Sequence, residues 1–93
     1  MEAKGYLDEA ARLLNQRGQT YQSSAGERSM SRIVGTFNTL TGADMSISDG
    51  WLFMLLLKLV RARNAPAWHP DSYKDAVAYA ALLAEQAQDE AEF

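Results

Sequence analysis

Apolar residues recur three and four positions apart along most of this 93-residue chain, which is the spacing of one face of an α-helix. Four segments carry the pattern, over about residues 2–16, 25–41, 47–63 and 71–90. No alternation of apolar and polar residues is long enough to predict a strand. We therefore expect an all-α fold, formed by one compact four-helix domain over residues 1–93.

Two serines mark the expected starts of the second and third helices. Ser24 is followed three positions later by Glu27, and Ser46 is followed at the same spacing by Asp49. In a capping box the serine side chain accepts a hydrogen bond from the first turn, and the carboxylate accepts one from the serine backbone N–H. Both pairs therefore predict a capping box.

Three glycines bear on helix ends and helix contacts. Gly18 and Gly42 follow the apolar stripes of the first two helices, and glycine adopts the left-handed conformation that ends a helix at little cost. Gly35 lies inside the second helix, where glycine costs about 1 kcal/mol relative to alanine. We expect Gly35 to allow the close approach of another helix.

The third helix is apolar around its whole circumference for two turns, from Trp51 to Leu57. A helix of this kind is normally enclosed on every side. Three short amphipathic helices, two of them rich in alanine, offer too little surface to enclose it. We therefore expect the third helix at the centre of the fold, completed by a second copy in a twofold dimer or covered by a host protein. The residues expected at this interface are Trp51, Phe53 and Met54.

Charge and composition narrow the partners and the location. The formal net charge of -3 at pH 7 disfavours generalised nucleic-acid binding, which needs a concentrated positive surface. The longest apolar run stops at Lys58 and is too short to span a membrane. The N-terminus has no apolar signal-peptide core, and the chain has no cysteine. These features predict a cytoplasmic protein that does not act at a membrane.

One group of polar residues is a candidate binding site. Lys58 and Arg61 share a face of the third helix, and Asp71, Asp75 and Tyr79 follow at four-residue spacing on the fourth. A short loop joins these helices, so we expect them to pack antiparallel and to bring the two sets together. Two interpretations stay open: a pocket for a phosphate or carboxylate ligand, or a salt-bridge network between helices. Paired charges are structural more often than functional.

Arg32 is a further candidate for the ligand-binding set. It lies four residues after Arg28, so both guanidinium groups face the same way and could join Lys58 and Arg61 in an anion site. The alternative is a solvated face beside the apolar stripe of the second helix.

No residue is predicted to be catalytic, and no cofactor is predicted. His69 is the only histidine, and without a cysteine or a second histidine it has no partner with which to share a metal. The serines near residue 24 have no histidine at the spacing of a nucleophile triad.

One arrangement of residues covers about two thirds of the chain, from Tyr21 to Glu85. Its most specific element is an apolar helix ending in Lys-x-x-Arg, then a short loop, then a helix with Asp-x-x-x-Asp-x-x-x-Tyr. The residues that carry it are Tyr21, Arg32, Phe37, Leu56-Leu57-Lys58-Leu59-Val60-Arg61, Asp71 and Asp75-Ala76-Val77-Ala78-Tyr79-Ala80-Ala81-Leu82. This stretch resembles a family of short phage-encoded helical proteins of unassigned function. The resemblance implies a phage protein in the cytoplasm of its host cell.

That family is similar in turn to the all-α MazG-like nucleoside triphosphate pyrophosphohydrolases, which are helical oligomers. Those enzymes hold magnesium with Glu-x-x-Glu on one helix and Glu-x-x-Asp on the next, because magnesium takes hard oxygen ligands. Asp71 and Asp75 could stand for the second pair, but Lys58 and Arg61 occupy the place of the first. The resemblance implies a magnesium cofactor only if this incomplete carboxylate site still binds the metal.

The incomplete carboxylate set favours a non-enzymatic accessory protein. We expect it to bind a host protein or an anionic, nucleotide-like ligand as a helical homo-oligomer. The alternative is a MazG-like nucleoside triphosphate pyrophosphohydrolase with a degenerate metal site.

Overall fold

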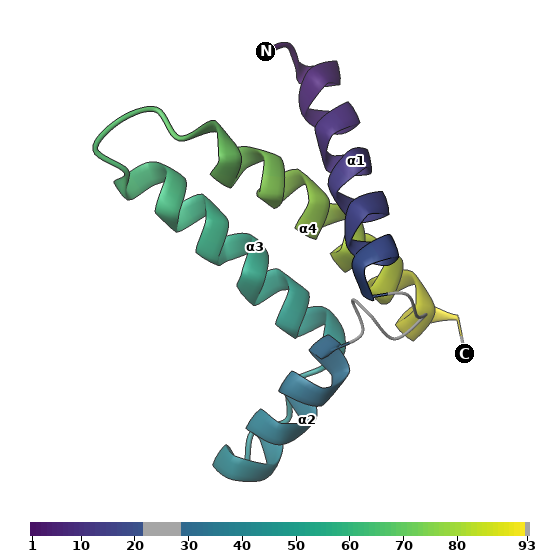
Figure 1. Ribbon diagram of the computed structural model, residues 1–93. Helices are drawn as coiled ribbons and strands as arrows, with labels where there is room; N and C mark the ends of the chain where they lie inside the picture. Colours follow the sequence, from purple (N-terminus) through teal and green to yellow (C-terminus); the bar gives the residue numbers. More distant parts are fainter. Residues whose placement is uncertain (22–28, 93) are drawn as a thin grey trace.

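The computed structural model describes residues 1–21 and 29–92, with side chains for residues 1–16 and 29–92. This part of the chain is helical and has no strand, which confirms the all-α class (Figure 1). Within it, no helix has the length and hydropathy that crossing a bilayer requires. The helices are α1 (Ala3–Tyr21), α2 (Ser29–Thr41), α3 (Ile47–Asn64) and α4 (Pro70–Ala91).

The helix ends agree with the expected ranges except in α1. Both ends of α3 and α4 lie within one residue of the expected positions, and α2 ends as expected. The expected start of α2, with its capping box at Ser24 and Glu27, lies outside the described residues. The prediction that Gly18 ends α1 is wrong, because the helix continues through it to Tyr21. Glycine permits the left-handed conformation that ends a helix but does not impose it.

The connection between α2 and α3 follows the predicted end and start signals. Gly42 has a φ of 75°, and its N–H donates to the carbonyl oxygen of Asn38 over 2.9 Å. The Asn38 amide bridges across the turn, donating to the Met45 carbonyl and accepting from the Met45 N–H, both over 3.0 Å. Ser46 and Asp49 then form the predicted capping box, with distances of 3.1 and 3.0 Å. The turn that aims α2 against α3 is therefore encoded locally.

The four helices are arranged in the spatial order α1, α4, α3, α2. α3 and α4 lie side by side as an antiparallel hairpin, as predicted from their short loop, while α1 packs on α4 and α2 packs on α3 (Figure 1). The antiparallel pairing is closed at its far end by Glu90. Its carboxylate accepts hydrogen bonds from the Ser48 backbone N–H over 3.0 Å and from the Ser48 hydroxyl over 2.7 Å.

The core lies where α2, α3 and α4 meet. Met30, Val34 and Trp51 are buried there, and the Trp51 ring packs on Tyr79 with centroids 5.8 Å apart. Among the described residues no large side chain is fully buried. The partly buried residues around this cluster are Met45, Ile47, Met54, Tyr79, Leu82 and Leu83.

A glycine allows the close contact between α2 and α3, but it is not Gly35. A Cβ at Gly50 would lie 2.5 Å from Met30 Sδ and 2.8 Å from Val34 Cγ2. A Cβ at Gly35 would have nothing within 4 Å, so the expectation for Gly35 is wrong. Gly35 follows the buried Val34 by one residue, which turns it about 100° around the helix and away from α3.

Candidate functional site

An ion pair joins the third and fourth helices, as the salt-bridge interpretation expects. Lys58 Nζ lies 3.0 Å from Asp75 Oδ2, and the two side chains are only 16% and 22% exposed. Lys58 lies on the α4-facing side of α3, two turns from Trp51, and Asp75 lies one turn before Tyr79 on α4. The pair therefore ties the two helices together near the core, and its two charges neutralise each other.

The remaining members of the predicted polar group do not join this pair. Asp71 is 79% exposed and lies 3.8 Å from Lys74 on its own helix. Arg61 is exposed, and Tyr79 packs against Trp51 in the core cluster. Five residues at the right helical spacing are thus divided between a helix contact, the core and the solvent. Their role as a ligand-binding set stays a prediction.

Arg32 faces away from Lys58 and Arg61. It is two residues from both Met30 and Val34, which places it about 160° around α2 from the face that packs on α3. There it lines a shallow depression of the outer surface with Gly35, Thr36, Thr39 and Leu40. Arg32 is thus separated from Lys58 and Arg61, while Arg28, the fourth member of the expected basic cluster, lies outside the described residues.

The carboxylates considered as metal ligands, Asp71 and Asp75, each lie beside a lysine. Asp75 is engaged by Lys58, and Asp71 lies beside Lys74. Over residues 1–21 and 29–92, no three side chains of His, Asp or Glu gather as a metal site would require. The magnesium-dependent alternative stays a prediction.

His69 has a partner that sequence reasoning did not identify. Its Nδ1 lies 2.7 Å from the hydroxyl of Ser72, which is buried at the start of α4. The contact spans one helical turn and satisfies a buried polar atom. Because Ser72 is inaccessible to a substrate, the pair closes the loop onto α4 and does not form a nucleophile site.

The three residues expected at an interface differ in exposure. Phe53 is 64% exposed, Met54 is half-buried, and Trp51 is only 7% exposed because it fills the core between α2 and α4. Trp51 is therefore a core residue of its own chain. The apolar surface that α3 presents to solvent lies on the side opposite Trp51.

That surface is a continuous strip along α3, here called the α3 face. At 100° per residue its members span about 120° of the helix circumference. None of them packs against α2 or α4 as part of the core cluster. The α3 face consists of Leu52, Phe53, Leu56, Leu59 and Val60, all exposed.

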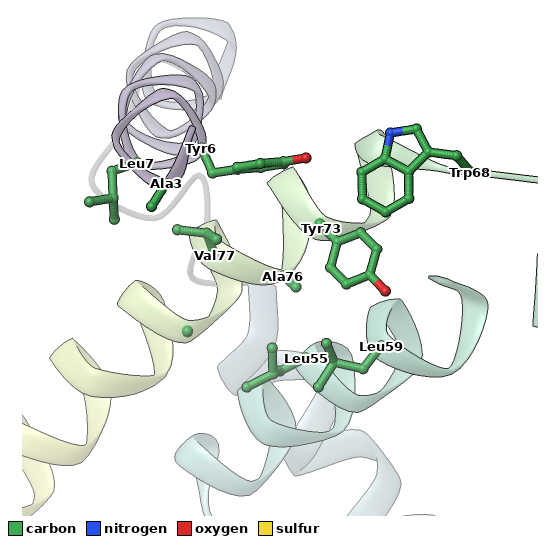
Figure 2. A pocket seen from close by; sticks show the side chains of 10 residues that line it. Ala3, Tyr6, Leu7, Leu55, Leu59, Trp68, Tyr73, Ala76 and Val77 are labelled. Carbon is green, nitrogen blue, oxygen red and sulfur yellow. The ribbon is translucent and has the colours of Figure 1, made fainter. Parts of the chain in front are cut away.

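A second apolar feature lies between α1, α3 and α4, here called the apolar groove. It has a volume of about 600 Å³ and almost no polar lining (Figure 2). Trp68, from the loop before α4, stacks on Tyr73 at its end with ring centroids 5.2 Å apart. Side chains that line the groove are Tyr6, Leu7, Leu55, Leu59, Trp68, Tyr73 and Val77.

Sequence reasoning missed the apolar groove, because α1, which is distant in sequence from α3 and α4, forms one side of it. Leu7 and Val77 belong to the periodic apolar positions of the first and fourth expected helices, and that spacing alone does not show what covers them. Leu7 and Trp68 are both largely exposed, and the position of α1 on α4 is a tertiary contact that no local pattern specifies. Leu59 lines the apolar groove and also belongs to the α3 face, so the two surfaces are continuous.

Comparison with known proteins gives a family but no characterised relative. A family model described as Domain of unknown function (DUF6378) matches residues 5–87. No curated protein and no solved structure matches the chain. The match supports the expected link to a family without an assigned function, while phage origin and similarity to the MazG-like enzymes stay predictions.

Proposed function

We propose that this chain, which belongs to the DUF6378 family, is a non-enzymatic binding protein whose working form is a helical homodimer. The observation that carries the proposal is the α3 face, with five large apolar side chains exposed on one side of one helix. Soluble monomers rarely keep a contiguous apolar patch of this kind in water. A second copy covers it with an identical strip, as in a twofold interface.

Sedimentation equilibrium over a wide concentration range tests the proposal. We expect a species of twice 10.3 kDa for the wild-type chain. Phe53→Glu should convert it to a monomer, because a carboxylate would have to be buried without a partner in the dimer. Phe53 is exposed in the single chain, so the variant should keep its helical circular dichroism spectrum.

Ala81→Glu is the matched control. Ala81 is exposed on α4, outside the α3 face and the apolar groove, and its substitution should leave the dimer intact. A single species of 10.3 kDa at every concentration would refute the dimer and leave the α3 face to a protein of another sequence.

The finer elements of the proposal rest on the resemblance to phage-encoded helical proteins. On that basis the homodimer acts as an accessory protein in the cytoplasm of a host cell and binds a host protein or an anionic, nucleotide-like ligand. Arg61 and Arg63 supply exposed positive charge at the end of α3, while Lys58 is neutralised by Asp75. The MazG-like pyrophosphohydrolase remains the alternative prediction.

A further inference from the structure

The α3 face repeats every seven residues along its helix. Seven positions separate Leu52 from Leu59. The same interval separates Phe53 from Val60, and Leu56 lies at the centre of the set. A seven-residue repeat of apolar residues is the pattern by which one helix pairs along its length with another. The α3 face therefore fits a second helix that lies alongside α3.

The same repeat ends in opposite charges. Asp49 lies seven positions before Leu56, and Arg63 lies seven positions after it. At 100° per residue each of them is turned only about 20° from Leu56, so both lie on the side of α3 that carries the α3 face. Both are exposed. This side of α3 is thus acidic at its start, apolar along its middle and basic at its end.

The two charges are open to a partner. Asp49 accepts the Ser46 N–H through Oδ2 over 3.0 Å, and a carboxylate has room for further donors. Arg63 forms no ion pair within the part of the chain whose side chains the structure describes. A second copy would therefore meet an unpaired cation at one end of the α3 face and an accessible carboxylate at the other.

Charge distinguishes the two ways in which a twofold axis can pair two α3 faces. An axis parallel to α3 makes the helices parallel, so that Asp49 lies beside its own copy and Arg63 beside its own copy. An axis perpendicular to α3 at Leu56 makes the helices antiparallel and brings Asp49 of each chain level with the partner's Arg63. Like charges across an interface repel, whereas opposite charges fix its orientation and register.

We propose that the homodimer pairs its α3 helices antiparallel about a twofold axis at Leu56, with Asp49 of each chain in an ion pair with the partner's Arg63. This inference rests on the proposed dimer and specifies its orientation and register. The two ion pairs are related by symmetry and close the two ends of the paired α3 faces. Arg61 is turned about 140° from Leu56, so it lies outside this interface and stays exposed.

Single cysteine variants test the orientation, and the absence of native cysteine makes each new thiol unique. Leu56→Cys lies at the proposed axis, so a short bis-maleimide reagent should join its two thiols in the dimer. In the antiparallel dimer the two thiols of Arg63→Cys are separated along the helix axis by about 21 Å, which that reagent does not span. We expect at least fivefold less covalent dimer from Arg63→Cys than from Leu56→Cys, at concentrations where sedimentation shows both to be dimeric.

Charge reversal tests the ion pair itself. Arg63→Glu places a carboxylate opposite Asp49 at both ends of the interface, so the dissociation constant of the dimer at low salt should rise about tenfold. Adding Asp49→Lys restores opposite charges and should return the constant to within about threefold of wild type. Circular dichroism checks that this variant is folded, because Asp49 also caps α3. Arg12→Glu makes the same change of charge on α1, which packs on α4, and should leave the constant unchanged.

The outcomes separate this inference from the dimer itself. A dimer in which Arg63→Cys cross-links as well as Leu56→Cys would overturn the antiparallel pairing and leave the homodimer standing. A dissociation constant that Arg63→Glu does not change would overturn the ion pair. A chain that sediments as a monomer at every concentration would overturn both the dimer and its orientation.

Discussion

At Gly50 a single missing side chain determines how closely two helices approach. Val34 is β-branched and stiff at χ1, so the Val34 methyl that a new Cβ would meet at 2.8 Å cannot move aside cheaply. Gly50→Ala should therefore lower the free energy of unfolding by about 1–3 kcal/mol, as overpacking of a close contact does. Urea unfolding followed by circular dichroism measures the change.

Gly35→Ala is the matched substitution on the neighbouring helix. Its Cβ would enter open space, so the alanine should raise the free energy of unfolding by about 0.4–1 kcal/mol through the entropy of the unfolded chain. Equal effects of the two substitutions would contradict the assignment of the helix contact to Gly50.

The half-buried ion pair is the second feature at this scale. Replacing only Lys58 with methionine, or only Asp75 with asparagine, leaves a charge without its partner between α3 and α4. Each single substitution should lower the free energy of unfolding by about 1–3 kcal/mol, which lies between the values for exposed and fully buried ion pairs. The double variant should lose less than the sum of the two, with a coupling of about 0.5 kcal/mol or more.

Lys74→Met is the control for this cycle. The Asp71 side chain beside Lys74 is largely exposed, so this substitution should alter the free energy of unfolding by no more than about 0.5 kcal/mol. Strict additivity of the Lys58 and Asp75 substitutions would show that the pair does not couple the helices.

At the scale of elements, the start of α3 and the end of α4 are joined by Glu90. The hydrogen bond from the Ser48 side chain, with a further one from Gln86, holds the pKa of the Glu90 carboxyl below its usual 4.5. A carboxyl whose pKa is lower in the folded than in the unfolded state stabilises the fold at pH values above its unfolded pKa. That contribution is lost as the pH falls from about 4.5 through the folded value.

The pH dependence of stability in the Glu90→Gln variant tests this contact between Glu90 and Ser48. The variant should have a lower thermal midpoint than wild type near neutral pH, and the difference should shrink as the pH falls below 4.5. Glu85→Gln, an exposed position on the same helix outside the contact, is the control and should match wild type near neutral pH. A difference between wild type and Glu90→Gln that is constant with pH would contradict the role of the charged form.

At the scale of the whole molecule, the chain is more extended than its length requires. The radius of gyration is 14.4 Å, whereas a compact domain of 93 residues is expected near about 12 Å. The spatial order α1, α4, α3, α2 explains this, because each terminal helix of the row has one neighbour. The α3 face and the apolar groove are left open to solvent as a result.

The sequence by itself determined the helices and their local connections. The apolar spacing predicted four elements, and the serine–carboxylate spacing at Ser46 and Asp49 and the glycine at Gly42 predicted where two of them begin and end. These signals act within one or two turns of backbone, so neighbouring residues suffice to read them. The Lys58–Asp75 pair was also predictable, because a short loop restricts how its two helices pack.

Only the tertiary structure decided which side of each helix is covered. The run from Trp51 to Leu57 is apolar all round, so its spacing cannot distinguish the side that faces the core from the side that faces solvent. The close approach of α2 at Gly50 and the packing of α4 placed Trp51 inside and Phe53 outside. The apolar groove likewise depends on where α1 crosses α4. Such choices rest on contacts between residues far apart in the chain, whose packing local periodicity does not encode.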